Sequence, residues 1–184
     1  MEALELLANR NSASRVGEPG PDRATLEELI GLALRVPDHG RLHPWRFLVI
    51  EGESRVRLGE LFVTALRRRK PEATGAEIDK SRDAPLRAPV VVAVIASLHD
   101  SPKVPAIEQT LSAGCCAHTL LLAAQALGFG AIWRTGENSY DRSIAAGLGL
   151  TDSEHIVGYI YIGTPLTPSK SPPPLNPADF IAFW

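Results

Sequence analysis

Ala88-Pro89-Val90-Val91-Val92-Ala93-Val94-Ile95-Ala96-Ser97 is the stretch that decides the fold. It is a nearly continuous apolar run with the length of one strand, and polar residues do not alternate with apolar ones along it. A strand of that pattern is covered on both faces. The sequence therefore predicts that residues 88–97 form the central strand of a sheet.

Other elements are expected on both sides of this run. Residues 45–51 are rich in aromatic and β-branched side chains and predict a buried strand, followed by a helix through residues 56–66. Residues 107–127 form the longest helical pattern, apolar nearly all round, which is typical of the centre of a fold or of a dimer interface. The remaining expected elements are a short helix at 3–8, a helix that opens with a capping box at residues 25–28 and ends near Arg35, an exposed helix within 71–83, strands at 131–134 and 156–162, and a short helix at 143–148.

This order of elements limits the fold class. Helices and strands interleave without a clean βαβ repeat, so the expected class is α+β, a sandwich in which helices flank a mixed central sheet. A chain of 184 residues is long enough to bury one substantial core, and we expect residues 1–184 to form a single domain.

The amino-acid composition excludes several classes of function. Hydrophobic residues make up 45% of the chain and charged residues 22%, which is typical of a soluble globular protein. A net charge of −2 provides no basic field for nucleic acid, and the apolar runs are too short to cross a membrane, so we expect no nucleic-acid partner, no membrane association and a cytoplasmic location. Cys115 and Cys116 are neighbours in an apolar helix and are expected to be packing thiols, without a disulfide or a zinc site.

The C-terminal segment has its own pattern. Residues 164–177 contain six prolines, which keep the chain extended and outside a central ladder. The segment ends in four large apolar residues, Phe180, Ile181, Phe183 and Trp184, which need to be covered. We therefore expect this arm to lie on a partner subunit.

Three polar clusters are candidates for a site. The first is the turn Arg10-Asn11-Ser12-Ala13-Ser14-Arg15. Its guanidinium groups and short hydrogen-bonding side chains suit a phosphate or the pyrimidine edge of a flavin. Polar turns after helices are also common without any function, so this cluster alone leaves both interpretations open.

The second cluster spans residues 35–47 and includes Arg35, Pro37 and His39. It lies between a helix and a strand, where loops often carry function. His39 and His43 are four residues apart, but Gly40 and Pro44 disfavour the helix that would place both on one face for a metal. A zinc-dependent hydrolase that uses these two histidines and His118 remains an alternative, and it predicts bound zinc and a colourless protein.

The third cluster spans residues 128–136, with the sequence GFGAIWRTG. It lacks the G-x-G-x-x-G pattern and leads into a strand, so a dinucleotide-binding Rossmann motif is excluded. Arg134, at a strand end beside Thr135, suits a phosphate, and the alternative is a surface arginine that follows the core residue Trp133.

In their order along the chain, these clusters resemble the nitroreductase family. Its members have an Arg-x-Ser turn after an N-terminal helix and a Pro-Trp-x-Phe entry into a strand, here Arg10-Asn11-Ser12 and Pro44-Trp45-Arg46-Phe47. The chain is similar to the compact members of the family over nearly its whole length, most clearly in four runs: ALELLANRNSASR (3–15), RVPDHGRLHPWRFLVIEGE (35–53), KVPAIEQTLSAGC (103–115) and GFGAIWRTG (128–136).

The resemblance implies a nitroreductase-like sandwich that forms a homodimer, exchanges its C-terminal arm and holds FMN at the subunit interface. It implies electron transfer from NAD(P)H through the flavin to a small acceptor such as a nitroaromatic or a quinone, with ping-pong kinetics and no dedicated catalytic acid or base. One alternative is a flavin-binding sensor or store without turnover. The implied cofactor residues are Arg10, Asn11, Ser12, Ser14, Trp133, Arg134 and Thr135 from one subunit, with Arg35, Pro37 and His39 from the other.

Within this scheme, the resemblance assigns roles to individual side chains. Arg10 and Arg134 would neutralise the phosphate, while Asn11, Ser12 and Ser14 would bond to the pyrimidine edge. Three positions depart from the family pattern: Ser14 replaces a basic residue, and Arg41 and His43 stand where Asn and Gln are common. These departures are expected to alter the hydrogen bonding around the flavin and hence its potential.

Overall fold

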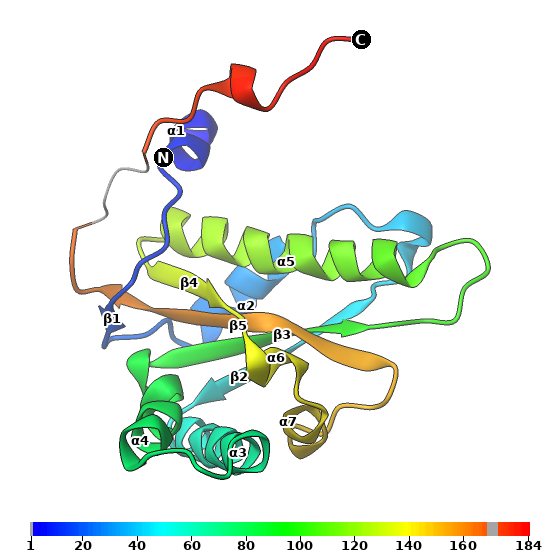
Figure 1. Cartoon of the computed structure of the whole chain (residues 1–184). Helices are drawn as coiled ribbons and strands as arrows, with labels where there is room; N and C mark the ends of the chain where they lie inside the picture. The colour runs from blue at the N-terminus through cyan, green and yellow to red at the C-terminus, as the bar shows by residue number, and fades with distance from the viewer. Residues whose placement is uncertain (1, 169–172) are drawn as a thin grey trace.

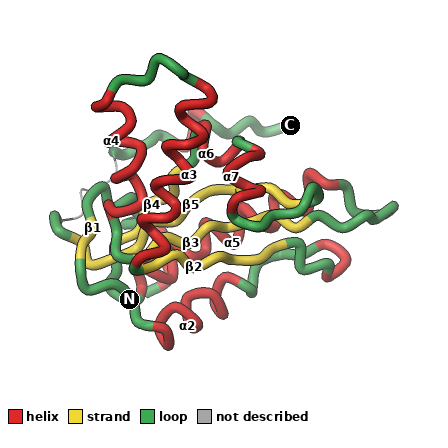
Figure 2. The backbone as a smooth tube through the Cα atoms, turned by 90° about the horizontal axis from the view of Figure 1, so that it is seen from below, coloured by secondary structure: helices red, strands yellow, loops and turns green. Residues whose placement is uncertain are grey.

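The computed structural model of the chain describes residues 2–168 and 173–184. A five-stranded sheet lies between two layers of helices, with α2 and α5 on one face and α3, α4 and α7 on the other (Figure 1). Figure 2, which looks at the sheet from below, shows α3 and α7 in front of the strands. The helices are α1 Ala3–Ala8, α2 Arg23–Ala33, α3 Glu53–Arg69, α4 Gly75–Asp83, α5 Ala106–Ala126, α6 Glu137–Tyr140 and α7 Arg142–Gly147, and the strands are β1 Val16–Gly17, β2 Trp45–Glu51, β3 Val90–Ser97, β4 Gly130–Arg134 and β5 Glu154–Pro165.

The apolar run at residues 88–97 forms the central strand, as predicted. β3 pairs with β2 on one side and with β5 on the other, and residues 91–96 are fully buried. One hydrophobic cluster fills the space between the sheet and the helices α2 and α5, and a second lies between the sheet and α3 with α7. A strand that faces two apolar layers needs no polar side, which explains its uniform composition.

The prediction of a mixed sheet is wrong for the part of the chain that the structure describes. All four strand pairings, β1 with β5, β2 with β3, β3 with β5 and β4 with β5, are antiparallel. The chain passes through two successive helices, α3 and α4, between β2 and β3, so it re-enters the sheet in the opposite direction. β3 and β4 are joined by one long helix and run parallel, but β5 lies between them.

The long helix follows the sequence prediction, and the C-terminal arm is exposed on the single chain. The helix predicted at 107–127 is α5, and no helix in the described ranges is both long and apolar enough to cross a lipid bilayer. Residues 173–184, which include the 3-10 helix η3 Pro177–Asp179, extend away from the sheet (Figure 1). Phe183 is 97% exposed and Trp184 is fully exposed on the single chain. The proline-rich segment lies partly outside the described residues, at 169–172.

The two cysteines differ in their environments. Cys116 is buried, and burial raises the pKa of its thiol to about 12. Cys115 is exposed on the outer side of α5. The expectation of two packing thiols is therefore right for Cys116 and wrong, within one chain, for Cys115, because no element among the described residues covers its side chain.

An ion pair links the two strands that flank β3, and its Glu154 end is buried while Arg46 is partly exposed. Arg46 of β2 donates from Nε and Nη2 to the carboxylate oxygens of Glu154 of β5, at 2.5 and 2.9 Å. The Thr151 N–H also donates to Glu154, at 3.0 Å. Hydrogen bonding by Arg46 is the main reason that the pKa of Glu154 falls from 4.5 to about 2.

This pair predicts a loss of stability in acid. The folded pKa of Glu154 lies below the unfolded one, so the stabilisation is complete above about pH 4.5 and disappears as the pH falls toward about 2. Its contribution is at most about 3 kcal/mol. Urea denaturation at a series of pH values from 7 to 2.5 measures it. Glu154→Gln should remove most of this pH dependence, and an unchanged slope would show that other carboxylates cause the acid sensitivity.

Candidate functional site

The first and third polar clusters are adjacent in the structure. The turn after α1 is fixed to the end of α5, where Gln125 Nε2 donates to the Asn9 carbonyl oxygen at 3.1 Å and the Asn11 N–H donates to Gln125 Oε1 at 3.4 Å. The Ala13 N–H donates to the Ala131 carbonyl oxygen of β4 at 3.0 Å. The polar turn at 10–15 therefore runs beside the free edge of β4.

Gly130 permits this close approach. A Cβ atom on Gly130 would lie 2.8 Å from Ala13 Cβ and 2.9 Å from Val16 Cγ1, which is closer than real side chains pack. Within the turn, the Ser12 N–H donates to Asn11 Oδ1 at 2.8 Å, while the Ser12 and Ser14 side chains are exposed. The turn thus has a fixed backbone and presents short polar side chains at the surface.

The last residues of β4 project to opposite faces of the sheet. Trp133 packs on the face covered by α5, and a Cβ atom on Gly158 of β5 would lie 2.0 Å from its Nε1, so only glycine fits beneath the indole. Arg134 points to the other face, where its guanidinium carbon lies 5.7 Å from the centre of the Tyr161 ring. Thr135 is exposed just beyond the strand. A ligand at this edge would therefore meet the backbone of 133–135 and the Thr135 side chain.

The second cluster lies at the other end of α5. His39 stands in the 3-10 helix η1 His39–Arg41, and its Nδ1 lies 2.6 Å from Glu108 Oε2 in the first turn of α5. The Asp38 carboxylate accepts the N–H groups of Leu42 and His43, at 3.3 and 2.8 Å. These two bonds fix a strained loop, because Arg41 and His43 both have positive φ, at 53° and 49°.

Within one chain, the His39 cluster and the Arg10 turn therefore lie far apart. Glu108 holds the His39 cluster near the start of α5, and Gln125 holds the Arg10 turn near its end. A helix rises 1.5 Å per residue, so these two anchor points are about 25 Å apart. A single flavin ring cannot contact both clusters of the same chain.

An apolar stripe runs along α5 between these two ends. Ile107 is 63% exposed and Leu111 is 61% exposed, and Cys115 and His118 follow on the same face at helical spacing. Two large apolar residues of α1, Leu4 and Leu7, are also exposed. Several exposed large apolar side chains on one helix face and on a neighbouring helix are typical of a protein interface.

The three histidines of the zinc alternative do not form a ligand set. Across residues 2–168 and 173–184, no group of three His, Cys, Asp or Glu side chains is placed to hold a metal ion. His39 is occupied by Glu108, and His43 packs edge-on against Trp45 with ring centres 5.9 Å apart. The structure therefore gives the zinc-hydrolase interpretation no support.

Two residues that build the site were not found from the sequence. Glu108 looks like an ordinary acidic residue in the first turn of a helix, and Gln125 looks like a polar residue near the end of one. Their partners are far away in the sequence, and no local pattern signals such a pairing. Only the packing of α5 between the two clusters shows that these side chains hold them.

Comparisons with known proteins identify relatives of the chain in sequence and in fold. The sequence profile described as "Nitroreductase family" matches residues 8–164. The chain is 40% identical over 188 residues to "Putative NAD(P)H nitroreductase YdjA" of Escherichia coli strain K12, with full coverage of both proteins. Among solved structures, a nitroreductase-like family protein from Bacillus cereus superimposes with a TM-score of 0.86 at 21% identity, covering 100% of this chain and 96% of the other. A point mutant of the "FMN and NADPH-dependent nitroreductase NfnB" from sphigopyxis sp. strain HMH gives a TM-score of 0.78 at 19% identity, with 100% and 99% coverage.

The chain belongs to the nitroreductase family and is an oxidoreductase with an α+β, nitroreductase-like fold. The resemblance inferred from the Arg10-Asn11-Ser12 turn and the Pro44-Trp45 strand entry is thereby confirmed.

Proposed function

We propose that the chain is an FMN-dependent oxidoreductase that works as a homodimer and transfers electrons from NAD(P)H to a small acceptor, such as a nitroaromatic or a quinone. The observation that carries this proposal is the separation of the two polar clusters at opposite ends of α5, with an exposed apolar stripe between them. Each end holds half of a pocket, and a second copy supplies the missing half.

A two-fold axis across the middle of α5 satisfies this requirement. Under such an axis two α5 helices run antiparallel, and each apolar stripe covers the other. The start of one α5 then lies beside the end of the other, which places one subunit's His39 next to the second subunit's Arg10 turn. Cys115 lies near the midpoint between Glu108 and Gln125 and so close to the axis.

The C-terminal arm supports the same arrangement. Residues 173–184 run away from the sheet, and Phe183 and Trp184 are exposed on their own chain (Figure 1). Large apolar side chains in this position gain stability only by packing on another molecule. We propose that the arm lies on the partner subunit.

The residues at the two ends of α5 fit FMN. Arg10 provides a cation for the phosphate, and Asn11, Ser12 and Ser14 provide short donors and acceptors for the pyrimidine edge. The flat end of β4 at Trp133, Arg134 and Thr135 would border the ring, and Arg35, Pro37 and His39 would cover it from the other subunit. One related structure carries the description FMN and NADPH-dependent, which supports this choice of cofactor.

In this proposal the side chains of the protein bind and orient FMN and do not themselves carry out the redox reaction. FMN, when bound, supplies the hydride chemistry, so no dedicated acid or base is needed. Glu108 is a positioning residue, because its carboxylate holds Nδ1 of His39 and thereby fixes the ring that faces the pocket. Donor and acceptor would use the same open face in turn, and ping-pong kinetics follow from that sharing.

Steady-state kinetics of the purified chain test the function. The protein should bind FMN, oxidise NADH or NADPH in the presence of a nitroaromatic or a quinone, and give parallel lines in double-reciprocal plots. Reduction of bound flavin without turnover would favour the sensor alternative. Failure to bind FMN at all would overturn the proposal.

Arg10→Ala is expected to weaken FMN binding by about 10- to 100-fold, or about 1.5–3 kcal/mol, because it removes a charged hydrogen bond to the phosphate. A fluorescence titration with FMN measures the change, and riboflavin, which lacks the phosphate, should bind both proteins equally. Arg68→Ala, at the exposed end of α3, is the matched control. Equal FMN affinity in Arg10→Ala and the control would remove Arg10 from the site.

A further inference from the structure

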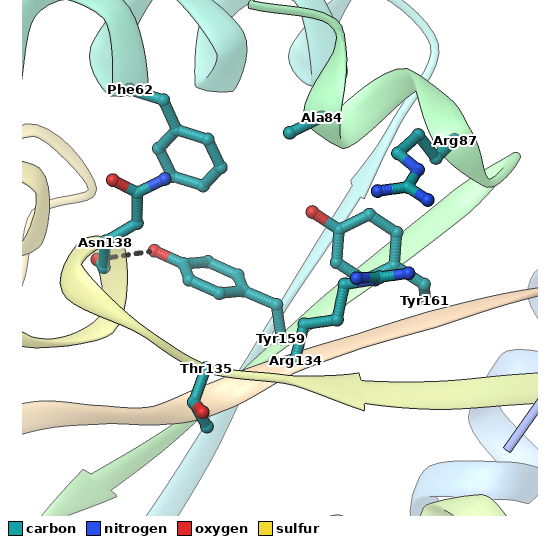
Figure 3. A pocket seen from close by; sticks show the side chains of 8 residues that line it. All are labelled: Phe62, Ala84, Arg87, Arg134, Thr135, Asn138, Tyr159 and Tyr161. Atoms are coloured by element: carbon teal, nitrogen blue, oxygen red, sulfur yellow. Dashed lines mark hydrogen bonds between the residues drawn. The ribbon is translucent and has the colours of Figure 1, made fainter. Parts of the chain in front are cut away.

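A small cavity lies on the α3 side of the sheet, away from the Arg10 turn. Its volume is about 120 Å³. Figure 3 shows Arg134 reaching toward it from the end of β4 and Arg87 from the 3-10 helix η2 Ala84–Arg87, on either side of the Tyr161 ring. The rest of the cavity is lined by Phe62, Ala84, Thr135, Asn138 and Tyr159.

The cavity is positively charged and has no counter-charge of its own. It is lined by two guanidinium groups and by no carboxylate of the described residues. The arginines Arg46, Arg69 and Arg142 each form an ion pair with a carboxylate. Within residues 2–168 and 173–184, neither Arg87 nor Arg134 lies within 4.0 Å of one.

Arg134 also has a polar atom without a partner. Its Nε is out of contact with solvent and forms no hydrogen bond within the described structure, and its guanidinium carbon lies over the Tyr161 ring. A buried N–H without an acceptor lowers the stability of the folded protein. Such a group therefore needs an explanation, and donation to a bound ligand is one.

The positive charges of Arg134 and Arg87 both affect the pKa of Tyr161. Burial raises the pKa of its hydroxyl, and the positive charges of Arg134 and Arg87 both oppose that rise. The neighbouring Tyr159 hydroxyl is engaged, because it donates to the Asn138 carbonyl oxygen at 3.4 Å. The two guanidinium groups therefore act on the same small space beside the Tyr161 hydroxyl.

We propose that this cavity is a binding site for a small oxyanion, held by Arg87 and Arg134 with the Tyr161 hydroxyl as a further donor. The planar forks of arginine match the oxygens of phosphate, and the volume equals about four water molecules. Pockets for drug-sized ligands are about 300–1,000 Å³, so a flavin ring does not fit here. The inference concerns one chain and does not depend on the dimer.

The oxyanion can come from two sources, free inorganic phosphate or the phosphate group of FMN. Isothermal titration of the full chain with inorganic phosphate, at constant ionic strength in chloride buffer, should show one saturable site per chain. Binding that persists at saturating FMN identifies the free anion. Phosphate binding that is displaced by FMN and not by riboflavin would move the flavin phosphate to this cavity and would contradict the assignment of that phosphate to Arg10. No saturable binding of phosphate would overturn the proposal.

Substitutions locate the binding to this cavity. Arg87→Gln and Arg134→Gln should each weaken phosphate binding by about 10-fold or more, and Arg68→Gln, outside the cavity, should leave it unchanged. Phosphate should also raise the melting temperature of the natural chain and of Arg68→Gln, and not that of Arg87→Gln. Arg87 is exposed at the cavity mouth, so its replacement keeps the test valid if Arg134→Gln fails to fold. Equal affinity in all variants would contradict the assignment.

Discussion

Arg46→Ala is expected to lower the free energy of unfolding by about 3–5 kcal/mol, because it leaves a buried charge without its partner. The Glu154 side chain is only 7% exposed, and Arg46 donates to both of its oxygens. Once the guanidinium is gone, the carboxylate keeps a single backbone donor, the Thr151 N–H. Such a loss is a large part of the roughly 5–15 kcal/mol that stabilises an ordinary domain.

Urea denaturation followed by circular dichroism measures this loss at pH 7. The double variant Arg46→Met, Glu154→Leu is the control, because it removes the charge together with its partner and should recover most of the stability. A loss below about 1 kcal/mol in Arg46→Ala would show that water reaches Glu154 and that the pair behaves as a surface ion pair.

Local sequence patterns predicted the positions of the main elements. The strand predicted at 45–51 and the helix predicted at 107–127 agree with β2 and α5 to within a residue, because composition and periodicity are local properties. The direction of the strands was not predictable in this way. It depends on how many helices the chain passes through before it returns to the sheet, and on the insertion of β5 between β3 and β4.

The candidate site was predictable in parts and not as a whole. The sequence identified the Arg10 turn, the His39 loop and the end of β4, because each carries an unusual density of polar side chains. It did not show that α5 separates the first two clusters or that Gln125 and Glu108 hold them there. It grouped Arg134 with Arg10, whereas Arg134 lines a cavity that no residue of the turn at 10–15 lines. The alternation of side chains along a strand predicts that Trp133 and Arg134 point to opposite faces of the sheet. It does not predict which residues each of them contacts.

Leu111→Glu is expected to produce monomers and to weaken FMN binding by about 1,000-fold, or about 4 kcal/mol. Leu111 lies on the exposed stripe of α5, near the proposed two-fold axis, so the substitution would bury two carboxylates in one apolar interface. Each chain would then offer only half of the pocket. Because Leu111 is 61% exposed on the single chain, the fold of the monomer should be unchanged in circular dichroism.

Light scattering and an FMN titration measure the two effects together, and Val56→Glu, on the exposed surface of α3, is the matched control that should stay dimeric and bind FMN. If Leu111→Glu remained dimeric, α5 would not be the interface. If it became monomeric and still bound FMN as tightly as the natural chain, one subunit would build the whole pocket, and the separation of the His39 and Arg10 clusters along α5 would have no role in flavin binding.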